Sequence, residues 1–163
     1  MTIAAARPNA TGAPGYSETL PCEPESARRA RTLVSAALHA WGLEDLAESG
    51  TLVVSELISN AVAHTRCRLT RVTIARVGNN TIRVAVADTS RQVPRMLTPT
   101  GHSGSGRGLF LVDALSDRWG YDLQRASKVV WAELRGEPKN PSGDAVGERP
   151  QDCSAPSACG GTG

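Results

Sequence analysis

Glu56, Asn60 and His64 are polar residues spaced four positions apart in a stretch rich in apolar residues. Residues at this spacing lie on one face of an α-helix. A carboxylate and an amide one turn apart are able to place a general base and an oxygen ligand for magnesium beside a nucleotide phosphate. An ordinary solvated helix face has the same pattern, and for His64 we favour that simpler interpretation.

Asp88 ends an alternating run of apolar residues, at the point where the chain leaves an expected strand for a long loop. A carboxylate in this position is able to accept a hydrogen bond from a ligand that carries an amino group. Aspartate at a strand end is also common turn chemistry, so the residue alone leaves both interpretations open.

A glycine-dense stretch from Gly101 to Leu109 runs directly into an expected helix. Glycines let backbone amides approach an anion closely, and a helix start adds free N–H groups and the positive end of the helix dipole. This arrangement favours a phosphate cradle. The stretch is neither a Walker lysine loop nor a Rossmann fingerprint, and its composition also suits any flexible loop.

The elements that must position these residues follow from apolar periodicity and from turn residues. Gly42 and Gly50 are expected to separate helices, and residues 78–80 to form a hairpin turn. Residues 89–106 are expected to form a lid or a disordered loop. Helices are predicted at 25–41, 43–48, 52–63 and 107–117, and strands at 16–20, 69–77, 81–87, 118–123 and 128–134. This order predicts a two-layer α/β (α+β) sandwich with a mostly antiparallel mixed sheet covered by helices on one face.

The composition of the chain indicates one domain. It has 163 residues, of which 40% are hydrophobic, and a net charge of +2 with no basic run. We therefore expect no direct nucleic-acid binding, and the lack of a long apolar stretch predicts a cytoplasmic protein without a membrane segment. Residues 1–15 and 136–163 are rich in Gly, Pro and polar residues, which predicts disordered ends around a domain at 16–135. The cysteines at 22, 67, 153 and 159 form no CxxC pair, and we expect reduced thiols.

Taken together, the three motifs resemble those of the GHKL (gyrase, Hsp90, histidine kinase, MutL) ATPases, which have the Bergerat fold. SELISNAVAH resembles the N-box, Asp88 the adenine-binding aspartate, and GSGRGLFLVDALSDRWG the second glycine motif. With the closing VVWAEL strand, the resemblance is greatest to the small anti-sigma-factor serine/threonine kinases, and it covers about residues 16–135.

The resemblance implies a role for each matching residue. Glu56 would activate the attacking hydroxyl, Asn60 would hold the Mg²⁺ ion of the bound ATP, and Asp88 would bind the adenine amino group. The phosphates would be lined, mainly by backbone amides, by Gly104, Gly106, Arg107, Gly108 and Leu109.

The sequence departs from the family pattern at two places. Active relatives have Asp-x-Gly-x-Gly where this chain has Asp88-Thr89-Ser90-Arg91-Gln92, and many have threonine where Val129 stands. The missing glycines remove backbone freedom, and the missing hydroxyl is expected to weaken adenine binding by about fivefold, as the loss of one hydrogen bond does.

Two functions follow from the resemblance and its departures. The first is an ATP-binding kinase that phosphorylates a Ser/Thr of an anti-anti-sigma (STAS-domain) protein and sequesters a sigma factor. The alternative is a catalytically degenerate module that binds partners and controls transcription without phosphoryl transfer. A histidine kinase is disfavoured because His39 lacks the helical hairpin that presents a phosphoacceptor histidine. An edge strand at 16–20 makes a homodimer a further hypothesis.

Overall fold

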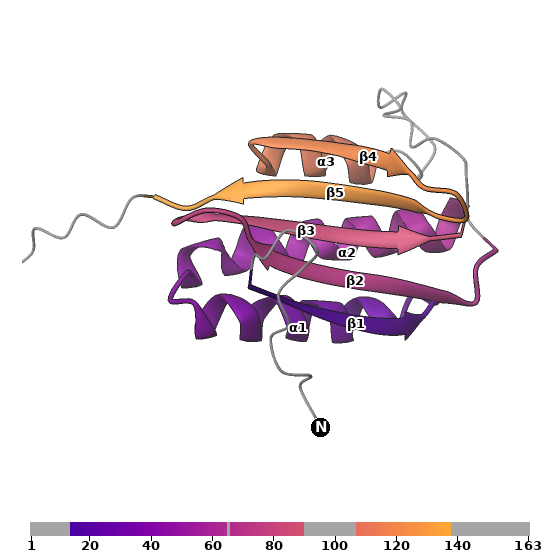
Figure 1. Ribbon diagram of the computed structural model, residues 1–163, viewed down its shortest axis with the longest axis horizontal. Coiled ribbons are helices and arrows are strands. Elements are labelled where there is room, and N and C mark those ends of the chain that lie inside the picture. The colour runs from indigo at the N-terminus through magenta and orange to yellow at the C-terminus, as the bar shows by residue number, and fades with distance from the viewer. Residues whose placement is uncertain (1–13, 65, 90–106, 138–163) are drawn as a thin grey trace, which may run out of the picture.

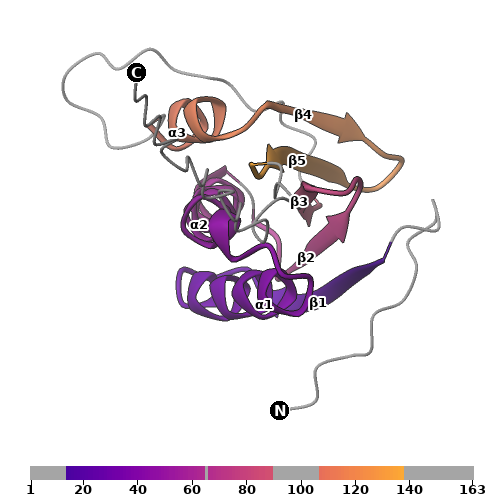
Figure 2. The ribbon, with the colours of Figure 1, turned by 90° about the vertical axis from the view of Figure 1, so that its left-hand side faces the viewer.

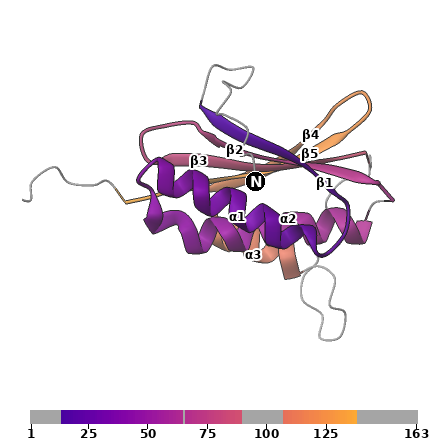
Figure 3. The same cartoon turned by 90° about the horizontal axis from the view of Figure 1, so that it is seen from below.

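The structure is a computed structural model that describes residues 14–64, 66–89 and 107–137 (Figure 1). Helices cover one face of a single sheet, so the predicted two-layer α/β sandwich is confirmed (Figures 2 and 3). Most of both predicted disordered ends, and residues 90–106 of the predicted lid, lie outside the described residues. Among the residues that are described, no helix combines the length and apolar character needed to cross a bilayer.

The sheet has five strands in the order β1-β2-β3-β5-β4. All four pairings are antiparallel, so the described sheet contains no parallel pair of the kind that a mixed sheet would have. The strands span Gly15–Pro21 (β1), Leu69–Arg76 (β2), Thr81–Asp88 (β3), Arg118–Leu123 (β4) and Lys128–Arg135 (β5). These bounds lie within two residues of the predicted ones. Alternating side chains of β3 and β5 face the helices and form the core.

Helix α1 spans Ser26–Ala40, and its buried side chains Ala30, Val34 and Leu38 recur at the predicted spacing. The Ser26 hydroxyl donates a hydrogen bond to the carbonyl of Pro21 at 2.7 Å, which ties the helix start to the end of β1. Gly42 follows the helix with a φ of 68°. Because this left-handed conformation suits glycine, the predicted stop at Gly42 is confirmed.

Helix α2 spans Ala47–His64 and follows the 3₁₀ turn Glu44–Leu46 (η1) directly. The sequence prediction that Gly50 separates two helices is therefore wrong. Gly50 is buried, and an added Cβ would lie 3.1 Å from Val34 Cγ1 and 3.3 Å from Leu38 Cδ1. The glycine lets α2 pack closely against α1, and this tertiary contact outweighs its weak helix propensity.

Helix α3 spans Arg107–Leu115 and packs against α2. It ends two residues earlier than predicted, and the Ser116 hydroxyl donates to the carbonyl of Val112 at 2.6 Å. The side chain of Trp119 packs against the core, and its ring N–H donates to Asp113 Oδ1 at 2.9 Å. These contacts join the last turn of α3 to β4.

The sheet face away from the helices carries an ionic cluster. Glu133 accepts hydrogen bonds from Arg83 and Arg118, and the Arg83 guanidinium lies 4.5 Å from the centre of the Trp131 ring. The hydrogen bond from Arg118 is the largest cause that lowers the pKa of Glu133, and Arg83 lowers this pKa further against the opposing effect of burial. The cluster ties β3, β4 and β5 together.

Two cysteines meet beside the edge strand β1. Cys22 follows β1 directly, and its backbone N–H donates to the carbonyl of Arg68 at 3.0 Å. Its Sγ lies 2.6 Å from Sγ of Cys67, which precedes β2. This contact cannot be predicted from the sequence alone, because the cysteines are 45 positions apart. Cys153 and Cys159 lie outside the described residues.

Candidate functional site

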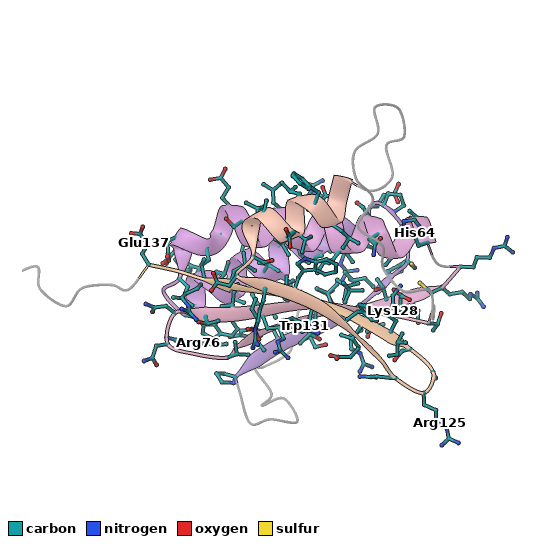
Figure 4. All side chains as sticks on the ribbon, turned by 90° about the horizontal axis from the view of Figure 1, so that it is seen from above. His64, Arg76, Arg125, Lys128, Trp131 and Glu137 are labelled. Carbon is teal, nitrogen blue, oxygen red and sulfur yellow. The ribbon has the colours of Figure 1, made fainter. Side chains whose placement is uncertain are left out.

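Glu56 and Asn60 lie on the polar face of α2, as predicted, and both are half-buried. The adjoining face of the helix is buried in the core through Val53, Leu57 and Ile58. His64 lies at the exposed C-terminal end of α2 (Figure 4). The predicted stripe therefore divides into two half-buried residues and one exposed residue, which agrees with the simpler interpretation of His64.

Gly108 of α3 lies against the Glu56 carboxylate. A Cβ added to Gly108 would lie only 2.6 Å from Glu56 Oε2, so this position admits no side chain without displacing the carboxylate. Gly108 is in the first turn of α3, where backbone N–H groups have no partner within the helix. The structure thus brings together the predicted general base and the helix start that was predicted to bind phosphate.

Asp88 and Lys128 form a buried ion pair at the end of the sheet. Lys128 Nζ lies 3.5 Å from Asp88 Oδ2, and each side chain is only 1% exposed. The two residues are direct cross-strand partners in the register of β3 and β5. Sequence reasoning selected Asp88 but missed Lys128. The alternation of β5 could have identified Lys128, because this lysine continues the series Val130, Ala132 and Leu134, which face the helices.

Thr70 adds a third buried polar side chain to this end of the sheet. It is 2% exposed, and its hydroxyl donates to the carbonyl of Ala87 at 2.9 Å. Its neighbours Val72 and Ile74 on the same face of β2 are fully buried. A row of buried polar side chains therefore crosses β2, β3 and β5 at the edge of an apolar inner face. We call it the polar row, and it consists of Thr70, Asp88 and Lys128.

The polar row lies at the same end of the molecule as the C-terminal half of α2 and the start of α3 (Figure 1). Figure 4 shows His64 of α2 and Lys128 of β5 at this end. Residues from β3, β5, α2 and α3 thus gather in one region. Carboxylates, an amide, an ammonium group and a helix start are a suitable set for holding a base at one place and an anion at another.

The remaining predicted site residues lie within or next to the glycine-rich stretch. Gly104, Gly106 and the side chain of Arg107 lie outside the described residues. The backbone of Arg107 begins α3, and Leu109 is buried, so any contact of Leu109 with a phosphate would be made through its backbone. Thr89 is exposed, and the other residues that replace the family glycines, 90–92, lie outside the described part of the chain.

The structure corrects the inference drawn from Val129. Neighbouring residues of a strand face opposite sides of the sheet, and Lys128, not Val129, shares the helix side with Asp88. Val129 is instead the cross-strand partner of Ala87. A threonine hydroxyl at position 129 would point away from Asp88, so valine at this position removes no contact from it.

The comparisons with known proteins concern the family and the fold of the chain. The sequence model of the histidine kinase-like ATPase domain matches residues 20–134. The uncharacterized protein SCO4941 of Streptomyces coelicolor is 40% identical over 70 residues, which are 42% of this chain and 65% of that protein. The chain thus spans slightly less than two thirds of this relative.

A solved structure has the same fold. The crystal structure of the RsbU and RsbW domains of Rv1364c from Mycobacterium tuberculosis matches with a TM-score of 0.57 and 19% sequence identity, over 76% of this chain and 33% of that one. This likeness supports the predicted Bergerat fold. Since the family model extends from the end of β1 to the end of β5, the chain belongs to the histidine kinase-like ATPase domain family.

Proposed function

We propose that this chain is an ATP-binding regulator of the anti-sigma-factor type, which phosphorylates a Ser/Thr of an anti-anti-sigma (STAS-domain) protein and sequesters a sigma factor. The observation that carries the proposal is the contact between Gly108 and the Glu56 carboxylate. It places a potential general base beside the helix start where phosphate groups bind most readily. The likeness to a structure that contains an RsbW domain supports the same class of protein.

Each site residue has a role in this proposal. Glu56 accepts the proton of the attacking hydroxyl, and Asp88 accepts a hydrogen bond from the adenine amino group. The start of α3, with Gly108 and Leu109, donates backbone N–H groups to the phosphates, together with Gly104, Gly106 and Arg107. Positioning of this kind provides most of the catalysis in phosphoryl transfer.

The donor set of α2 fits a magnesium ion. Asn60 supplies a half-buried amide oxygen one helical turn from Glu56, and Mg²⁺ prefers oxygen ligands and shares them with substrate phosphates. When bound, the ion would neutralise charge on the phosphates. In this proposal Asn60 holds the ion and orients it, and Glu56 remains available to move the proton.

Phosphoryl transfer to a partner tests the proposal directly. The purified chain is incubated with γ-labelled ATP, Mg²⁺ and a panel of STAS-domain proteins, with the Glu56→Gln variant as a matched control. We expect label on a Ser or Thr of one partner with the wild-type chain and at least a hundredfold less with Glu56→Gln, because loss of a general base costs 10²–10⁴-fold. Transfer that is unchanged in Glu56→Gln would contradict the assigned role.

The alternative function rests on the sequence that follows Asp88. Thr89-Ser90-Arg91-Gln92 replaces the glycines of active relatives, which favours a degenerate module that binds partners without phosphoryl transfer. Such a module would bind a sigma factor or a STAS-domain protein equally well with and without ATP, and it would transfer no label. The same labelling experiment, combined with a pull-down in both conditions, separates the two functions.

A further inference from the structure

Lys128 is a fully buried lysine in a position that the core does not require to be charged. Its side chain is 1% exposed, and the next residues on the same face of β5 are Val130, Ala132 and Leu134. Burying an ion pair has a desolvation cost that well-packed apolar residues of similar size avoid. Fold stability alone therefore does not account for a lysine at this position.

Lys128 and its partner Asp88 together offer a hydrogen-bond donor and an acceptor to a ligand. Asp88 presents a carboxylate oxygen, which only accepts hydrogen bonds, and Lys128 presents an ammonium group with three N–H donors. Their 3.5 Å separation places an acceptor and a donor side by side on one face of the sheet. Adenine has the complementary pattern, because its amino group donates and the ring nitrogens on either side of that group accept.

We propose that Lys128 is a second base-binding residue, which donates a hydrogen bond to a ring nitrogen of the adenine whose amino group Asp88 accepts. The inference rests on the proposed function, since it requires nucleotide binding at Asp88. An ammonium group can donate to Asp88 and to a base at the same time. The pair then recognises two neighbouring atoms of the base, whereas a carboxylate alone recognises one.

The position of the pair makes this recognition selective. Polar contacts in a site shielded from water are stronger than exposed ones, and a missing partner is costly there. An adenine analogue that lacks the contacted ring nitrogen would leave the Lys128 ammonium facing a C–H group. A loss of about tenfold in affinity is expected for such an analogue.

The test is isothermal titration of the full chain with Mg²⁺ and each of three nucleotides: ATP, 1-deaza-ATP and 7-deaza-ATP. The wild-type chain should bind one of the two analogues about tenfold more weakly than ATP. In Lys128→Met, ATP should bind about tenfold more weakly, and that analogue should then bind as ATP does. Arg135→Met serves as the control, because Arg135 is on the same strand in an exposed ion pair with Asp117 and should bind all three nucleotides as the wild type does.

Several results would overturn the inference. Equal binding of ATP and both analogues by the wild-type chain would overturn it without any variant, even if Lys128→Met fails to fold. Tighter ATP binding by Lys128→Met would also overturn it, because the lysine would then compete with the base for Asp88. If ATP binds under these conditions, the proposed function survives either result. If no nucleotide binds at all, both fail.

Discussion

Gly108→Ala should separate the stability of the fold from the chemistry of the site. The added Cβ would lie 2.6 Å from Glu56 Oε2, and ordinary van der Waals contact begins at 3.4 Å, so the carboxylate must retreat by about 0.8 Å. This oxygen is the far end of a flexible side chain, so the fold can accommodate the shift. Alanine is also a better helix former than glycine by up to about 1 kcal/mol. The melting temperature should therefore stay the same or rise.

The activity should respond differently. Misplacement of a reacting group by about 1 Å costs on the order of a hundredfold in rate, so we expect phosphoryl transfer from ATP to fall by roughly tenfold to a hundredfold. ADP formation in a single turnover measures this rate. Gly78→Ala is the matched control, because it adds a Cβ at 3.3 Å from Thr81 Cβ in the β2–β3 hairpin, at the far end of β3 from Asp88.

The double variant Glu56→Gln/Gly108→Ala identifies the cause of the lost activity. In a Glu56→Gln chain the carboxylate is already absent as a base, so adding Gly108→Ala should lower the rate little further. Such non-additivity is expected when two residues act through one contact. Full activity of Gly108→Ala, or the same relative loss of activity in both backgrounds, would contradict the role of Gly108 in positioning the Glu56 carboxylate.

Three other predictions concern the rest of the molecule. Glu133→Gln should lower the free energy of unfolding by about 1 kcal/mol at neutral pH. The pKa of Glu133 is lowered in the folded state, so the contribution of Glu133 to stability is present above the ordinary pKa of 4.5 and is lost as the pH falls through the folded-state pKa. Urea unfolding measures the difference in stability between the wild type and Glu133→Gln. The same difference well below pH 4.5 would contradict this expectation. Treatment with hydrogen peroxide should join Cys22 and Cys67, whose Sγ atoms lie 2.6 Å apart, in a disulfide, and the peroxide is reduced to water. The intact mass of the chain should decrease by two hydrogens. A number of free thiols that stays constant after treatment would contradict this expectation. Because β1 is an edge strand, we expect a homodimer through β1, and a monomer mass by light scattering at high concentration would exclude it.

Much of the fold could be predicted from the sequence because its elements have clear periods. The four-residue spacing of Glu56 and Asn60 placed both on one helix face, and the alternation of β3 and β5 gave strand bounds accurate within one residue. The prediction at Gly50 is wrong because packing against α1 outweighs the weak helix propensity of glycine there. Only the position of α1 shows that a side chain at Gly50 would contact Val34 and Leu38.

The candidate site was less predictable because it depends on pairing between distant residues. The alternation of β5 already places Lys128 on the buried face, but its pairing with Asp88 is visible only once β3 and β5 are in register. Without that register, the resemblance to the family points to Val129 instead as the position that supports the base. The contact between Gly108 and Glu56 likewise depends on how α3 packs on α2, which periodicity does not reveal.

We propose that a nucleotide binds where α2, the start of α3, the end of β3 and the start of β5 meet. Isothermal titration of the purified chain with ATP and Mg²⁺, beside the Asn60→Ala variant, tests it most directly. We expect the wild-type chain to bind ATP, and we expect Asn60→Ala to weaken binding in the presence of Mg²⁺ but not in its absence. No binding by the wild-type chain up to about millimolar ATP, the weak end of the usual affinity range, would contradict the claim.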